Sequence, residues 1–323
     1  MKYWWIQPLA RSIVAIALPL MVPACITMLM WSLPGDPAEI ICPPSICTGG
    51  AELAERWHLH EGAWGFYTHW VSNAMQLNFG DSWRVLTGAK ISELMTQTMP
   101  NTLLLIALAL IPITIGSILG AFEKPPKKYD AVLLAMGVVP VVVLALVVAA
   151  FVELRFGGSA ETGLGYWSRM VAAAATLGIA DGALSSSILG VRSAFEQENR
   201  QRYVGISILR GESLFQNTLP NISGSLVGQY RSRIVQLLSS AVIVEVIVGV
   251  DGFGALLWRG TLMQDFGVVL TAATIFATIS SGLLLFQAMV EVAQNMFQRH
   301  SPTIDENDIS VDGSTNATIL GDA

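Results

Sequence analysis

The chain has 323 residues, of which 53% are hydrophobic and only 13% are Asp, Glu, Lys or Arg. A typical globular chain carries about 25% charged residues, so this composition disfavours a soluble enzyme, a nucleic-acid-binding domain and a secreted disulfide-stapled domain. The apolar residues fall in long blocks, and the mean hydropathy is +0.55. The formal net charge of −6 comes mostly from five acidic residues in the last 23 positions, so it indicates no polyanionic partner. The composition indicates a polytopic membrane protein.

Six apolar blocks approach the roughly 20 residues that a membrane-spanning helix needs. The first is too long for the hydrophobic part of a signal peptide, and no small-residue cleavage site follows it. In the second, Gly116-x-x-x-Gly120 favours close helix packing. We predict an all-α membrane protein with six transmembrane helices, over residues 12–31, 101–122, 131–152, 170–191, 234–250 and 266–290.

The basic residues predict the orientation of these spans. Twelve of the 18 Lys and Arg residues fall in segments on the same side as the N-terminus, and six fall on the other side. Since basic residues concentrate on the cytoplasmic side of membrane proteins, both termini are predicted to be cytoplasmic. The chain then divides into the N-terminus and first span, a periplasmic region, a transmembrane core with a cytoplasmic loop over 192–233, and a disordered acidic tail, with bounds at 1–31, 32–100, 101–300 and 301–323.

Two cysteines follow the first span. Cys42 and Cys47 enclose the segment Cys-Pro-Pro-Ser-Ile-Cys, in which the prolines favour a turn that brings the thiols together. The outer face of a bacterial inner membrane is oxidising, so we predict a disulfide between them; two free thiols are the alternative. Cys25 lies inside the first span and is expected to pack as a small apolar residue.

Motifs for catalysis, nucleotide binding and metal binding are absent from the sequence. There is no Gly-x-x-x-x-Gly-Lys-Ser/Thr phosphate loop, no His-Glu-x-x-His motif and no Gly-x-Ser-x-Gly elbow. The four histidines lack zinc-site spacing with cysteines, and we interpret His58 and His60 as solvated residues of the outer region. An intramembrane enzyme is disfavoured because no histidine lies in a span to act as a base. We expect no catalytic residue, no metal and no cofactor bound by this chain.

Two acidic residues, Asp181 and Glu245, lie within the predicted spans. An acid at the centre of a transmembrane helix costs roughly 2.5–3.5 kcal/mol, so such residues mark a polar translocation path or a subunit interface by default. A position near the membrane surface is the alternative, above all for Glu245, which lies near the outer end of its span. A secondary transporter would use these acids as ion sites, but it would also show an internal repeat between the first and last three spans, and we find none.

Four short motifs occur in a fixed order along the chain. They are Leu33-Pro34-Gly35-Asp36-Pro37, Leu77-Asn78-Phe79-Gly80-Asp81-Ser82, Pro100-x-Thr102-Leu103, and Glu245 followed by Gly252-Phe253-Gly254. With this order and topology, the chain resembles the permease subunits of binding-protein-dependent ABC importers, specifically the dipeptide/oligopeptide branch. The similarity runs from the first span to about Phe297. It implies a type I importer fold, with Gly252 and Gly254 forming a turn at the outer gate.

The resemblance also implies that residues 192–233 dock on an ATPase through a short coupling helix. The family's pattern there is carried by Arg192, Tyr203, Val204, Arg210, Gly211, Leu219, Pro220 and Asn221. A glycine at position 211 can take the positive φ that ends a helix, and Pro220 is expected to stop the next one. The spacing from Gly211 to Pro220 is about four residues shorter than the family's, roughly one helical turn. A solvated face is the alternative role for the arginines.

The partners and cargo follow from the resemblance alone. It implies a second permease subunit that completes a heterodimeric pore, two ATPase subunits that bind the ATP, and a periplasmic substrate-binding protein. Peptides are the expected cargo, although the branch also carries nickel, glutathione and glycosides. Importers of antimicrobial peptides of the Sap type, which confer resistance to such peptides, are a specific candidate within it.

Overall fold

The computed structural model describes residues 6–41, 50–122, 125–156, 163–211 and 214–300. Over these ranges the chain is helical without any β-strand, and a single β-bridge pairs Asp81 with Lys90. The predicted all-α fold is confirmed. The predicted acidic tail and the predicted pairing of Cys42 with Cys47 lie outside the described residues.

The helices follow one another with short connections. They are α1 (Ile6–Ser32), α2 (Pro37–Ile41), α3 (Gly50–Arg56), the 3-10 helix η1 (Leu59–Glu61), α4 (Gly62–Met75), α5 (Ile91–Ala121), η2 (Lys127–Tyr129), α6 (Asp130–Gly137), α7 (Val141–Phe156), α8 (Gly163–Ile179), η4 (Ala180–Gly182), α9 (Ala183–Asn199), α10 (Arg202–Leu209), α11 (Leu214–Val248), α12 (Phe253–Leu262) and α13 (Phe266–His300).

Four helical segments of the described chain are long and apolar enough to cross a membrane, and there are six if each of two bent helix pairs forms one span. The six predicted spans correspond to α1, α5, the α6–α7 pair, the α8–α9 segment, the α11–α12 pair and α13. The chain is therefore a multi-pass membrane protein, with helices that extend well beyond several of the predicted boundaries.

The third predicted span is not one continuous helix, and this part of the prediction was wrong. Helices α6 and α7 meet at an angle of 81°. Pro140, just before α7, has no N–H to donate to a helix that would continue from α6. Asp181, which lies between α8 and α9, stabilises the bend between α6 and α7. Its carboxylate accepts the N–H of Val141 at 3.0 Å, and its own N–H donates to the carbonyl of Val139 at 3.1 Å.

The fourth predicted span is interrupted at Asp181. Asp181 and Gly182 have φ values of +50° and +71°, so the chain takes two left-handed steps between α8 and α9. The whole segment, Gly163–Asn199, is 37 residues long. It is longer than a single bilayer-spanning helix needs, so part of α9 extends beyond the membrane.

Pro220 does not stop a helix, contrary to our expectation. Helix α11 begins at Leu214 and runs through Pro220 to Val248. The helix loses one backbone hydrogen bond at the proline. It continues because the residues that follow pack against α9 and α13. Much of the predicted loop over 192–233 is therefore helical.

Small residues allow the central helices to approach closely. A Cβ atom placed on Gly120 of α5 would lie 2.4 Å from the carbonyl oxygen of Ile188 in α9, and one on Gly116 would lie 2.7 Å from a methyl group of Leu184. This confirms the packing role of the Gly116-x-x-x-Gly120 motif. The buried core that results lies among α5, α7, α8 and α11.

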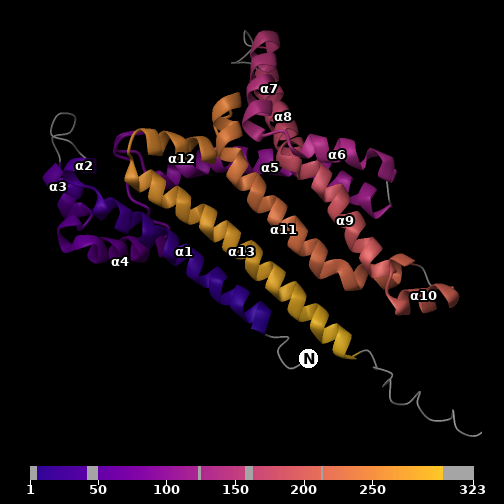
Figure 1. Ribbon diagram of the computed structural model, residues 1–323. Coiled ribbons are helices and arrows are strands. Elements are labelled where there is room, and N and C mark those ends of the chain that lie inside the picture. The colour runs from indigo at the N-terminus through magenta and orange to yellow at the C-terminus, as the bar shows by residue number, and fades with distance from the viewer. Residues whose placement is uncertain (1–5, 42–49, 123–124, 157–162, 212–213, 301–323) are drawn as a thin grey trace, which may run out of the picture.

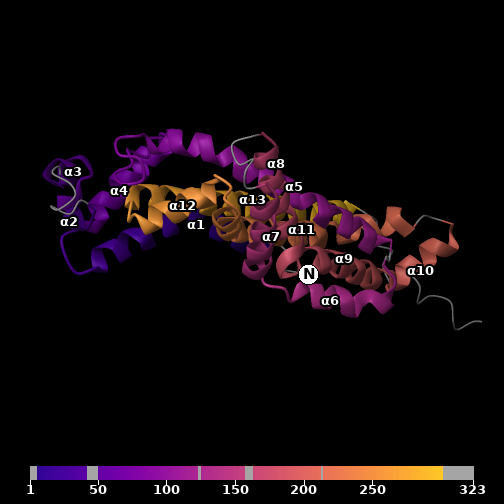
Figure 2. The same cartoon turned by 90° about the horizontal axis from the view of Figure 1, so that it is seen from above.

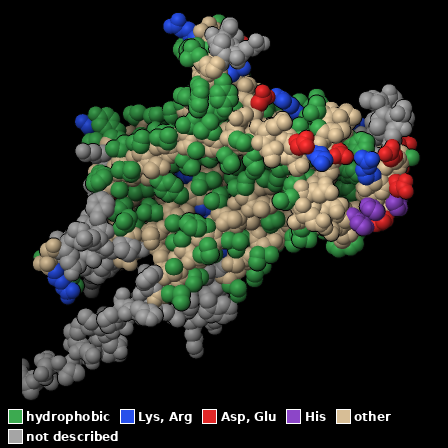
Figure 3. Space-filling model, turned by 180° about the vertical axis from the view of Figure 1, so that it is seen from behind, with side chains coloured by type: hydrophobic (Ala, Val, Ile, Leu, Met, Phe, Trp, Pro, Cys, Tyr) green, Lys and Arg blue, Asp and Glu red, His purple; other side chains and the backbone are tan. Residues whose placement is uncertain are grey.

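The remaining elements lie around this core (Figure 1). Helices α1 and α13 lie side by side, joined by an ion pair between Arg11 and Glu291, so the beginning of α1 and the end of α13 lie at the same end of the molecule. The short helices α2–α4 and helix α10 lie at opposite ends (Figure 2). Hydrophobic side chains cover the middle of the face in Figure 3, as a lipid-exposed surface requires, while histidines and charged side chains gather toward one edge.

Candidate functional site

Helix α10 and its connections form the centre of the predicted ATPase-docking segment. Val204 is completely buried on one side of α10, which packs against α9 and α11. On the other side, Ile206 and Leu209 have 52% and 89% of their surface exposed. Arg210 is exposed as well. The helix is thus anchored by one face and presents an apolar face with an adjacent cation.

Gly211 ends α10 with a positive φ, as its position in the sequence predicted. Its φ is +77°, and the last hydrogen bond of the helix joins the N–H of Arg210 to the carbonyl of Ile206 at 3.2 Å. Among the described residues other than its chain neighbours, no atom lies within 4 Å of where a Cβ on Gly211 would be. The need for glycine here is therefore a matter of backbone conformation and not of space.

The other residues of the predicted docking segment are spread over α10 and α11. Tyr203 lies in α10 and Pro220 in α11, and both helices continue through them. Leu219 is 45% exposed, and Asn221 is exposed beside it. Thr218, which is buried, donates to the side-chain oxygen of Asn199 at 3.3 Å and so joins the start of α11 to the end of α9.

Arg192 does not lie on a docking surface, in contrast to the role expected for it. Its side chain is only 4% exposed, and it pairs with the carboxylate of Asp130 at 2.6 Å while it donates to the carbonyl of Pro125. A neighbouring ion pair joins Lys127 to Glu196 at 2.8 Å. That hydrogen bond from Lys127, together with the positive charges of nearby side chains, outweighs burial and lowers the pKa of Glu196. Arg192 therefore fixes α9 to the segment before α6.

Glu245 is buried within the chain, with none of its surface exposed. Its carboxylate accepts the hydroxyl of Thr102 at 2.6 Å and the N–H of Ala255 at 2.9 Å, and Thr102 in turn accepts the N–H of Phe253 at 2.7 Å. The acid thus lies at the start of α12, where the helix dipole favours a negative charge. The part of Glu245 in a translocation path or at a subunit interface stays a prediction.

Gly252 and Gly254 make room for this carboxylate. A Cβ on Gly252 would lie 2.3 Å from the carboxyl carbon of Glu245, and one on Gly254 would lie 2.6 Å from the Cα of Val242. The spacing from the acid to the two glycines is therefore explained by a close approach of α12 to α11. Gly252 lies at the 75° bend between these helices, whereas Gly254 lies within α12, and their part in an outer gate stays a prediction.

Asp181, in contrast, is exposed. Its carbonyl accepts the side-chain amide of Gln236 from α11 at 3.1 Å, and its carboxylate caps α7. The residue lies where three helical segments meet, so it remains available to a polar path through the membrane. Its hydrogen bond to Val141 shows that it also has a structural use.

The sequence analysis missed Asp265, which is buried with 1% of its surface exposed. One carboxylate oxygen accepts the hydroxyl of Ser82 at 2.7 Å and the N–H groups of Trp83, Arg84 and Val85 at 3.0–3.2 Å; the other accepts the N–H of Val268 at 3.3 Å. An Asp directly before a helix is an N-cap signal, which could have identified its bond within α13. No sequence pattern around Asp265 indicates its contact with residues 82–85.

Comparison with known proteins agrees with this architecture. A family model described as "Binding-protein-dependent transport system inner membrane component" matches residues 113–297, more than half of the chain. The matched region includes the docking segment, Glu245 and α12. The chain belongs to this family and is a permease subunit of an ABC importer in the bacterial inner membrane. Members of the family are transport components and generally non-catalytic. Membership does not favour a secondary transporter.

Several permeases of other bacteria are similar to this chain along most of their length. A probable peptide ABC transporter permease, y4tP of Sinorhizobium fredii, is 24% identical over 89% of this chain and 96% of its own. The oligopeptide transport system permease AppB of Bacillus subtilis is 25% identical over 83% of this chain and 91% of its own. The glutathione transport system permease GsiC of Escherichia coli is 23% identical over 80% and 87%.

Proposed function

We propose that this chain forms one half of the pore of an ATP-driven importer for peptides. Two of the relatives above are named for peptide or oligopeptide transport, and the third for glutathione, which is itself a tripeptide. The other half of the pore would be a second permease subunit. Two ATPase subunits would supply the energy, and a periplasmic binding protein would deliver the cargo to the outer region.

The observation that carries this proposal is the exposed apolar face of α10. Ile206 and Leu209 leave large side chains uncovered at the end of the molecule where the described chain begins and ends, while Val204 fixes the helix to α9 and α11. An uncovered apolar face on a firmly attached helix suits a partner that must transmit force through it. The same end carries most of the basic residues, so we place it in the cytoplasm, where ATP is available.

A pair of matched substitutions tests this assignment. Leu209→Asp places a charge on the exposed face of α10, whereas Leu86→Asp makes the same change at an exposed leucine of the outer region, which is 56% exposed. The chain is expressed together with the ATPase genes of its host, and co-purification of the ATPase subunits is measured in detergent. We expect Leu209→Asp to lose the ATPase subunits and Leu86→Asp to retain them.

The two variants also separate docking from folding. Both leucines are exposed, so neither change should prevent membrane insertion, which is checked by the amount of chain in the membrane fraction. Equal retention of the ATPase by both variants, with both inserted, would refute docking through α10. Peptide cargo is tested separately, by uptake of labelled di- and oligopeptides in cells that express the complete importer.

A further inference from the structure

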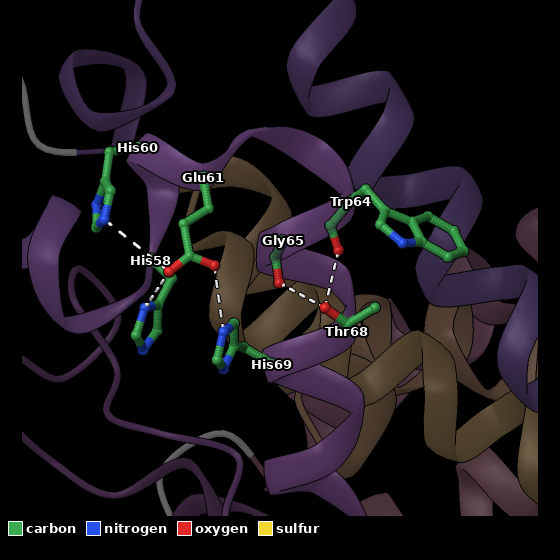
Figure 4. A network of polar contacts seen from close by, with 7 residues as sticks. All are labelled: His58, His60, Glu61, Trp64, Gly65, Thr68 and His69. Carbon is green, nitrogen blue, oxygen red and sulfur yellow. Dashed lines mark hydrogen bonds and ion pairs between the residues drawn. The ribbon is translucent and has the colours of Figure 1, made fainter.

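Three side chains of the types that bind transition metals meet in the outer region (Figure 4). They come from the loop before η1, from η1 itself and from α4. The Nδ1 atom of His58 lies 3.0 Å from one carboxylate oxygen of Glu61, and the Nε2 atom of His69 lies 3.2 Å from the other. The three ligand atoms all lie within 4.8 Å of one another.

The backbone is built to bring these groups together. His58 has a φ of +53°, a left-handed conformation that turns its ring back toward α4. Gly65 then allows Glu61 to extend along the helix to His69, because a Cβ at this position would lie 2.4 Å from the Cβ of Glu61 and 2.9 Å from its Oε2. Thr68, next to His69, donates instead to the carbonyls of its own helix.

The geometry fits a four-coordinate metal ion. Bonds of about 2.0–2.2 Å from a zinc ion to imidazole nitrogen and carboxylate oxygen place tetrahedral ligand atoms about 3.3–3.5 Å apart. The two His–Glu distances are already close to this spacing. Because these two contacts use different carboxylate oxygens, rotation of the Glu61 side chain is needed to direct one of its oxygens and both ring nitrogens at one ion.

The two imidazole rings and the carboxylate of the cluster lie in close contact. The rings of His58 and His69 are stacked with their centroids 4.0 Å apart and an interplanar angle of 8°. Burial opposes ionisation of Glu61, but the hydrogen bond from His58 and the charges of His69, His58 and His60 outweigh it and lower the pKa of Glu61.

We propose that His58, Glu61 and His69 bind a divalent transition metal ion of borderline softness, with Zn²⁺ as the best match. Two imidazoles and one carboxylate are a set of ligands that zinc accepts in proteins, with water in the fourth position. A cavity of about 230 Å³ beside both histidines, also lined by Arg56, Asn73 and Asp81, has room for that water. The metal replaces any proton on Nδ1 of His58 and Nε2 of His69 and releases it to solvent.

Such an ion would stiffen the outer region where it meets α13. Trp57, adjacent to His58, stacks on Phe66 of α4 with ring centroids 5.8 Å apart. The edge of Trp57 also lies against Gly267 near the start of α13, where a Cβ would lie 2.6 Å from the indole. A metal that joins His58 to α4 would therefore hold the α4–Trp57–α13 contact in place.

The test uses the full-length protein, purified in detergent without a histidine tag and stripped with a chelator. Zn²⁺ is titrated by calorimetry, and Co²⁺ serves as a visible-absorbance probe of four-coordinate geometry. We expect one equivalent to bind with proton release. Loss of a residue that merely orients a ligand typically weakens metal binding about 10–100-fold, so loss of a direct ligand should weaken it by about 100-fold or more.

Variants decide between this site and non-specific binding. The variants His58→Ala, His69→Ala and Glu61→Gln should each fail to bind the one equivalent of Zn²⁺. Gly65→Ala should weaken binding while every ligand is retained, because the new methyl displaces Glu61. Thr68→Val is the matched control on the same helix and should bind as the unaltered protein does.

The proposal is overturned if no stoichiometric Zn²⁺ binding occurs, or if His69→Ala and Thr68→Val bind equally well. Thermal unfolding of each metal-free variant shows whether it is folded. Should a histidine variant fail to fold, Glu61→Gln decides the question, because it preserves the volume of the side chain and changes only its charge and one ligand atom.

Discussion

The buried carboxylate of Asp265 allows a sharp test of how the outer region is attached to the membrane helices. We predict that Asp265→Ala destabilises this junction strongly. The carboxylate accepts one hydroxyl and three consecutive backbone N–H groups from residues 82–85, and it also accepts the N–H of Val268 within α13.

The magnitude follows from these contacts. A hydrogen bond to a charged group contributes about 1.5–3 kcal/mol, and a buried donor left without a partner costs about 1–3 kcal/mol. Trp83, Arg84 and Val85 are only half-buried, so water can replace part of what their N–H groups lose. We therefore expect Asp265→Ala to lower the free energy of unfolding by about 3–5 kcal/mol. Asp265→Asn keeps one acceptor oxygen and should cost about half as much.

The assay is denaturant unfolding of the purified protein in detergent, with limited proteolysis to detect local opening of residues 76–90. Asp251→Ala is the matched control, because Asp251 likewise accepts a hydrogen bond, here from Arg259 at 2.5 Å, but is 74% exposed. Exposed ion pairs of this kind contribute about 0–1 kcal/mol. Equal unfolding of Asp265→Ala and Asp251→Ala, with no new proteolysis near Trp83, would refute the reasoning.

Three further predictions concern coupling, orientation and the first outer segment. Gly211→Val forces a branched residue into a left-handed conformation at a local cost of about 1–2 kcal/mol, so transport and stimulated ATP hydrolysis should fall together in a complex that still assembles; wild-type transport would exclude Gly211 from coupling. Reporter fusions after Arg299 and Trp83 should report cytoplasm and periplasm, and a cytoplasmic signal from Trp83 would reverse the orientation. Alkylation and mass spectrometry without reductant should find Cys42 and Cys47 joined, whereas full labelling of both thiols would disprove the disulfide.

The parts of the fold that could be predicted are those that depend on local composition. Long apolar blocks located the membrane helices, and Gly116 and Gly120 indicated a close packing that α9 then provides. The positive φ at Gly211 was also predictable, since a glycine after a short helix is a common end signal. Each of these depends on a few neighbouring residues.

The errors involve partners that are distant in the sequence. Arg192 was assigned to a docking surface through the resemblance to the permease family, yet its side chain turns toward Asp130, 62 positions away. Pro220 was expected to end a helix because proline has no N–H to donate within it. The packing of α11 against α9 and α13 outweighs this loss. No sequence pattern reports which surface a neighbouring helix will cover.

The metal-ligand cluster was missed for a related reason. The sequence analysis considered His58 and His60, which are neighbours in the chain, whereas the structure pairs His58 with His69 through Glu61. This pairing requires a left-handed residue at position 58 and a glycine at position 65 at the same time. Spacing alone could suggest Glu61 and His69, two helical turns apart, but not the reversal that brings His58 to them.

The two intramembrane acids share a physical role that neither expected assignment captured. A helix that breaks within a membrane leaves backbone N–H groups at the start of its second half, and hydrocarbon offers them no acceptor. Asp181 accepts the first N–H of α7, and Glu245, with Thr102, accepts those at the start of α12. An acid at the centre of a transmembrane helix costs roughly 2.5–3.5 kcal/mol. An unsatisfied N–H there costs several kcal/mol, so the hydrogen bond that the acid accepts offsets the cost of placing the acid in the membrane. Both bent helix pairs of the described chain are stabilised in this way, and the acids occur where the helices bend.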